Sequence, residues 1–167
     1  MKLAVCAHNL DGGAIVAAVA FDEWDAAEAS RTFTSRVAPL DPPVRRPQGL
    51  AELAAVLQLL REHALEPELI VIDGPVHLDA TEKPGWGRQL FDALGGRSAV
   101  IGMSTRTMPG LPSQFEVWRD EEARPLIVTC IGIDLGAAKA RVRTMHGRRR
   151  VPTLMKLATR LARGGAG

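Results

Sequence analysis

Two apolar runs near the start of the chain are separated by turn residues, and this pattern constrains the fold more than any other. The runs are Leu3–His8 and Ala14–Phe21, and the residues between them include Asp11-Gly12-Gly13. Asp-Gly and Gly-Gly between apolar runs are typical of tight β-hairpin turns. A third extended segment, Thr32–Val37, precedes a proline-rich turn. The chain is therefore predicted to begin as a three-stranded antiparallel meander.

Beyond the meander, helical and strand patterns alternate along the chain. Leu50, Leu53, Leu57 and Leu60 recur at helical spacing, whereas Leu69–Ile72 is a compact apolar run of the kind found in buried strands. By the same criteria, strands are predicted at 69–72, 98–102, 115–118 and 126–130, and helices at 50–64, 87–94 and 152–163. This order resembles the ribonuclease H-like fold, an α/β fold whose mixed sheet has an antiparallel three-strand meander followed by alternating helices and parallel strands.

Length and composition are consistent with one domain spanning residues 1–167. The chain has 46% hydrophobic and 24% charged residues, enough for a core and for solubility. No apolar run approaches the ~20 residues that cross a bilayer, and no signal-peptide cleavage site is recognised. Cys6 and Cys130 lie far apart without a CxxC spacing. A cytoplasmic protein without membrane association is expected; the sequence does not define its oligomeric state.

Charge is distributed unevenly along the chain. The net charge is +2, yet residues 135–167 contain nine Lys or Arg and no acidic residue. Arg148, Arg149 and Arg150 precede the last predicted helix, and Lys156, Arg160 and Arg163 repeat along one side of it. Such a segment is either a solvated cationic face or a surface for polyanions, and a nucleic-acid partner would bind it through phosphates.

Several segments, taken in order, resemble the endonuclease V family, metal-dependent nucleases that cut near deaminated bases. They are the hairpin at Asp11-Gly12-Gly13, the strand LIVIDG ending at Asp73-Gly74, the strand VIGMS at 100–104, and the segments RPLIVTCIG and RRRVPTLMKLATRLAR. The resemblance covers residues 3–163. It implies a nucleic-acid partner and, in an active member, Mg²⁺ or Mn²⁺ as cofactor.

The residues that match the family's catalytic positions depart from its pattern. Asp73 matches a metal-binding, catalytic carboxylate, whereas Cys6 and Arg46 stand where the family has an Asp and a Glu. Thr105 and Ile133 replace a lysine and a histidine. A neutral thiol is a poor ligand for a hard cation, and an arginine repels one. The resemblance therefore implies a catalytic centre that has lost most of its carboxylates.

Two further positions come from the same resemblance. Leu40, in Pro39-Leu40-Asp41-Pro42, stands where the family has a tyrosine that wedges beside the lesion, and a leucine loses the aromatic stacking. His77 matches a histidine that follows the Asp-Gly pair and is taken as a second catalytic residue. Arg45 and Arg46 are expected on the same nucleic-acid-binding rim.

The residues themselves offer other partners for Asp73. Asp79, Glu82, His77 and Asp134 follow predicted strands and are candidates for a rebuilt metal site. A solvated loop is the simpler explanation for Asp79 and Glu82, and a helix N-cap is the simpler explanation for Asp134. The sequence thus favours a catalytically degenerate nucleic-acid-binding domain. Two alternatives stay open: an active Mg²⁺- or Mn²⁺-dependent endonuclease with a rearranged site around Asp73, and an interaction or small-ligand module with a pocket lined by Cys6, His8 and Asp73.

Overall fold

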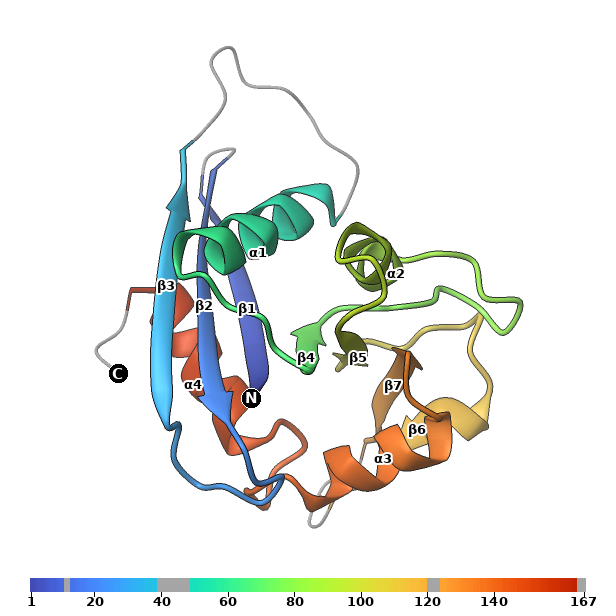
Figure 1. Cartoon of the computed structure of the whole chain (residues 1–167). Helices are drawn as coiled ribbons and strands as arrows, with labels where there is room; N and C mark the ends of the chain where they lie inside the picture. The colour runs from blue at the N-terminus through green and yellow to red at the C-terminus, as the bar shows by residue number, and fades with distance from the viewer. Residues whose placement is uncertain (11–12, 39–48, 120–123, 165–167) are drawn as a thin grey trace.

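The computed structural model describes residues 1–10, 13–38, 49–119 and 124–164. Its seven-stranded sheet has the strand order β3-β2-β1-β4-β5-β7-β6, with helices on both faces (Figure 1). The strands are β1 (Lys2–Leu10), β2 (Gly13–Phe21), β3 (Arg31–Val37), β4 (Leu69–Asp73), β5 (Ala99–Ser104), β6 (Glu116–Val117) and β7 (Leu126–Ile131). The helices are α1 (Leu50–Glu62), α2 (Trp86–Ala93), α3 (Leu135–Thr144) and α4 (Thr153–Ala162), with a short 3-10 helix at Ser113–Phe115.

The first three strands form the predicted meander. β1 and β3 both pair antiparallel with β2, and the register places Cys6 opposite Ala17. Eight of the nine residues of β2 are buried, because α1 packs on one face of this part of the sheet and α4 on the other (Figure 1). The alanines of β2 suit this position, since small side chains let helices approach both faces of the strand.

The central strands are parallel. β4 pairs parallel with β1 and with β5, as the predicted helix-strand alternation requires. β7 instead pairs antiparallel with β5, because the described part of the β5–β7 connection contains only the 3-10 helix and the edge strand β6, and no long crossover helix. The α/β, ribonuclease H-like fold class is confirmed, and its parallel part consists of β1, β4 and β5.

Two hydrophobic layers flank the sheet. One lies under α1 and α2 and includes Leu59, Ile70 and Leu90; the other lies under α3 and α4 and includes Val142 and Leu154. Side chains alternate between these layers along each strand, so that Val5 faces the first layer and Cys6 the second. This alternation decides which side chains of β1 face α4.

Small differences from the sequence prediction arise at element ends. The edge strand predicted at 115–118 is only Glu116–Val117, because Phe115 ends the 3-10 helix. The helix predicted from Pro152 begins one residue later: Pro152 is the N-cap in an extended conformation, and the helix starts at Thr153. Among the described residues, none of the helices has the length and hydropathy that a membrane span requires.

Candidate functional site

Cys6 and Asp73 lie side by side at the end of β4. The parallel register pairs Val5 with Ile72, and the next residues along the two strands are Cys6 and Asp73. β1 is longer than β4, so the middle of β1 faces the carboxyl end of β4. In sheets of this kind that end of the strands is where binding sites form. The adjacency follows from parallel pairing, and it brings together Cys6 and Asp73, which the sequence resemblance matches to two metal-binding positions.

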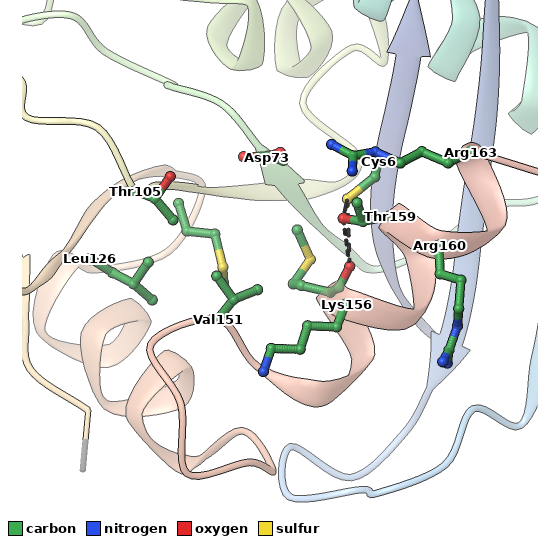
Figure 2. Close-up of a pocket in the computed structure, with 11 residues that line it drawn as sticks. Cys6, Asp73, Thr105, Leu126, Val151, Lys156, Thr159, Arg160 and Arg163 are labelled. Atoms are coloured by element: carbon green, nitrogen blue, oxygen red, sulfur yellow. Dashed lines mark hydrogen bonds between the residues drawn. The ribbon is translucent and has the colours of Figure 1, made fainter. Parts of the chain in front are cut away.

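The Cys6 thiol is a neutral group held by α4. Its side chain is 4% exposed, and the Thr159 hydroxyl lies 3.2 Å from Sγ and 2.9 Å from the Met155 carbonyl oxygen (Figure 2). Burial raises the pKa of Cys6 to about 12, with a smaller increase from Asp73. The thiol therefore stays protonated at neutral pH and supplies neither a charge nor a strong metal ligand.

Asp73 is exposed at the end of β4, yet the surrounding protein still disfavours its charge. Desolvation raises the pKa of the Asp73 carboxyl, and the nearby cations Arg106 and Arg163 partly oppose the increase. In Figure 2 the Arg163 side chain extends from the end of α4 towards Cys6 and Asp73. The Arg163 guanidinium thus lies near the Asp73 carboxylate. A metal-binding site would need further oxygen ligands around this carboxylate instead of a cation.

The turn after Asp73 is fixed by groups on the neighbouring strands. The Gly74 amide donates to the Met103 carbonyl oxygen at 3.1 Å, and the Val76 amide donates to the buried Thr129 hydroxyl at 2.9 Å. Gly102 leaves room for this turn, because a Cβ at that position would lie 2.2 Å from the Gly74 carbonyl oxygen. Sequence reasoning overlooked Thr129 and Gly102; a glycine inside an apolar strand, a common sign of close backbone approach, was the available signal.

A pocket of about 630 Å³ opens between α4 and the sheet beside these residues. Cys6 and Asp73 line it together with Thr105 and Thr159. Its apolar wall consists of Met103, Leu126, Val151 and Met155, and its cationic side chains are Lys156, Arg160 and Arg163 (Figure 2). The site therefore combines one carboxylate with three cations and an apolar wall, which we also call the floor of the pocket. His8, which shares a face of β1 with Cys6, is not among the lining residues.

The structure brings together some of the predicted nucleic-acid-binding residues. Lys156 and Arg160 are exposed on α4, with Lys156 extending along the pocket and Arg160 directed away from Asp73 in Figure 2. Arg148, Arg149 and Arg150 lie in the segment between α3 and α4 and do not line the pocket. Leu40, Arg45 and Arg46 lie outside the described residues. The binding roles of all these side chains stay predictions.

His77 lies apart from Asp73. It is 7% exposed and does not line the pocket. Its backbone forms an isolated antiparallel β-bridge with Pro84, in the loop before α2. Burial lowers the pKa of His77, an effect that Glu82 opposes, and its Nε2 atom is buried without a hydrogen-bond partner among the described residues. The neutral imidazole is favoured there. Its catalytic role stays a prediction, with no contact to the pocket in its support.

The other candidate ligands serve local structure. The Asp79 carboxylate accepts hydrogen bonds from the Thr81 amide at 3.0 Å and the Lys83 amide at 3.1 Å, which closes its own turn. Asp134 caps α3 by accepting a hydrogen bond from the Ala137 amide at 3.3 Å. Neither residue lines the pocket. Within the described ranges, no three His, Cys, Asp or Glu side chains are grouped so that they could hold a metal ion.

Metal coordination therefore does not fit the described part of this site. Mg²⁺ and Mn²⁺ prefer several oxygen ligands in near-octahedral geometry. The pocket supplies one carboxylate, a protonated thiol and three cations. A neutral thiol at Cys6 and the Arg163 guanidinium near Asp73 both lower the affinity of the pocket for a cation, and the guanidinium raises its affinity for an anion.

Comparisons with solved structures identify the fold. Endonuclease V from Streptomyces avermitilis has a TM-score of 0.73 at 21% sequence identity, and the match covers 98% of this chain and 79% of that one. Ciona intestinalis endonuclease V, crystallised with a DNA containing inosine, has a TM-score of 0.75 at 15% identity, with 98% and 84% covered. The human endonuclease V catalytic domain has a TM-score of 0.70 at 18% identity, with 98% and 80% covered.

These likenesses place the chain in the endonuclease V fold. No family model matches the sequence, and no curated protein matches it either. The resemblance predicted from the sequence is thus confirmed in three dimensions, with nearly the whole chain superimposed. At identities this low, the likeness establishes the fold and leaves the chemistry of the site to its own residues.

Replacing Asp73 by Asn is expected to stabilise the protein at neutral pH. Because desolvation raises the pKa of Asp73, the ionised carboxylate costs folding free energy above that pKa, and the cost disappears below about pH 4, where the group is protonated in both states. Thermal unfolding should give a higher Tm for D73N at neutral pH and equal Tm values at about pH 3. A lower Tm for D73N at neutral pH would mean that the carboxylate is held by favourable partners.

Proposed function

We propose that this chain is a nucleic-acid-binding domain with an endonuclease V fold that binds its partner without a metal ion and does not cleave it. The observation that carries the proposal is the composition of the pocket beside Asp73. One carboxylate remains there, Cys6 is a neutral thiol, and Lys156, Arg160 and Arg163 add three cations. A phosphodiester would meet positive charge from side chains where a nuclease would supply it from metal ions.

The cations of α4 are suited to phosphate. Lys156, Arg160 and Arg163 follow one another at i, i+4 and i+7, so they lie along one side of a helix. All three are exposed and line one pocket, while the apolar side of α4 packs into the core through Leu154, Met155 and Ala158. Phosphate contacts of this type hold a strand without reading its sequence.

The fold likeness supports the choice of partner. The Ciona intestinalis protein was crystallised with DNA, and nearly all of this chain superimposes on it. A nucleic-acid-binding surface that was kept while the metal site was lost explains both the likeness in fold and the positive charge of the pocket. The nine basic residues of 135–167, with no acidic residue among them, extend the same electrostatic preference.

Binding should be strongly salt-dependent and should not require a divalent metal ion. If the three α4 cations each neutralise one phosphate of a single strand, raising the salt from about 50 to about 200 mM should weaken binding roughly 20-fold. Fluorescence anisotropy of a labelled inosine-containing oligonucleotide in EDTA measures this slope. Absence of a complex at low salt, or an affinity insensitive to salt, would overturn the proposal.

A further inference from the structure

The pocket beside Asp73 has the features of a small-molecule site as well as of a phosphate surface. Its volume of about 630 Å³ is within the range of cavities that enclose ligands of nucleotide size. A surface that only contacted a phosphate backbone would not need the apolar residues that line this open pocket. The floor therefore indicates a ligand with an apolar body in addition to an anionic group.

The floor favours an aromatic body. The Met103 and Met155 thioethers and the Cys6 thiol line the same pocket, and the three residues are at most 4% exposed. Sulfur atoms make favourable contacts with aromatic rings, and Met side chains adapt to their shape. The neutral thiol adds no charge that would oppose an uncharged ring.

The charged groups favour a phosphate over a carboxylate. Three cations and one carboxylate give the pocket an excess of positive charge that suits a dianion better than a monoanion. Lys156 and Asp73 lie at well-separated positions of the pocket in Figure 2. A phosphate near Lys156 and a ring amino group donating to Asp73 would satisfy both ends, with the ring over the sulfur atoms.

We infer that this pocket binds an aromatic phosphate monoester, a single nucleoside monophosphate or the phosphorylated end of a strand, with side-chain cations in place of a metal. Binding of a free nucleoside monophosphate does not depend on the proposed nucleic-acid-binding function. Where the monoester is a strand end, the inference rests on the proposed function and names the part of the nucleic acid that enters the pocket.

The direct test is isothermal titration calorimetry of adenosine monophosphate with the whole chain in EDTA. Adenosine and inorganic phosphate, titrated separately, report the two halves of the ligand. The monophosphate should bind at least about tenfold more tightly than either half. No heat from the monophosphate at millimolar concentration, or equal affinity for inorganic phosphate alone, would overturn the inference.

Two pairs of variants connect the binding to this pocket. Thr105→Trp places a bulky ring at the exposed pocket mouth, while Thr107→Trp makes the same change at an exposed position outside the lining. Lys156→Gln removes a pocket cation, and Lys83→Gln removes an exposed cation elsewhere. Thr105→Trp and Lys156→Gln should each weaken monophosphate binding about tenfold, and the two controls should not. Equal effects in a pair would place the ligand elsewhere.

Oligonucleotides with and without a terminal phosphate separate the two sources and the two proposals. A terminal phosphate that tightens binding to the natural chain but not to Thr105→Trp identifies the strand end as the ligand. If the affinity for oligonucleotides changes neither with the terminal phosphate nor with Thr105→Trp, the pocket is assigned to the free nucleotide. If oligonucleotides bind and the monophosphate does not, the inference fails and the proposed function stands; the opposite result overturns the proposed function alone.

Discussion

Reversing the charge of Lys156 and Arg160 together is expected to weaken oligonucleotide binding on the order of 100-fold at low salt. Both side chains are exposed on α4 and line the pocket. The change therefore removes the two phosphate contacts proposed for them and adds two repulsive charges. The fold should be unaffected because neither side chain belongs to the hydrophobic layer beneath the helix. The salt dependence should become shallower, since fewer counterions are released on binding.

A matched control separates this local effect from net charge. Arg61→Glu with Lys83→Glu changes the charge of the chain by the same amount, at two exposed positions that do not line the pocket. Anisotropy titrations of both double variants against the natural chain should show a small loss for the control and a large loss for the α4 variant. Equal losses would show that overall charge, and not this helix, attracts the nucleic acid.

The second large effect is expected at Arg119, whose side chain is 4% exposed. Its Nη1 atom donates to the Val142 carbonyl oxygen at 2.6 Å, and its Nη2 atom donates to those of Met145 at 2.9 Å and Gly147 at 2.7 Å. Its Nε atom donates to the Arg149 carbonyl oxygen at 2.9 Å. One guanidinium thus fastens the end of α3 and the segment that leads to α4.

Arg119→Met should lower the free energy of unfolding by about 3 kcal/mol, because it keeps much of the side-chain length but leaves several carbonyl groups without their donor. The corresponding decrease in Tm is roughly 6–12 °C for a chain of this size. Thermal and urea unfolding measure both quantities. Arg124→Met, at an exposed position, is the control, and an equally small effect of the two substitutions would contradict the role of Arg119.

Much of the fold could be predicted from the sequence, because the spacing of apolar residues and the turn residues determine local secondary structure. The Asp11-Gly12-Gly13 turn and the apolar runs beside it predict the hairpin, and the run ending at Asp73 predicts a buried strand. The direction of β7 could not be predicted this way, since a buried apolar run looks the same in parallel and antiparallel pairing.

The site was only partly predictable. The sequence resemblance identifies Cys6 and Asp73 as candidate site positions, and their adjacency follows from parallel pairing of β1 with β4. The approach of α4 was not predictable, because the contact between Thr159 and Cys6 joins residues 153 positions apart. Arg119 was likewise overlooked, since its partners are backbone carbonyl groups that carry no sequence signal.

The measurement that tests the central claim most directly compares binding and cleavage of one labelled inosine-containing oligonucleotide in Mg²⁺, in Mn²⁺ and in EDTA. The composition of the Asp73 pocket predicts that the complex forms in all three conditions, including EDTA, and that the strand stays intact in each. Cleavage that requires Mg²⁺ or Mn²⁺ and disappears in D73N would contradict it, because Asp73 would then share a metal ion with ligands beyond the described residues.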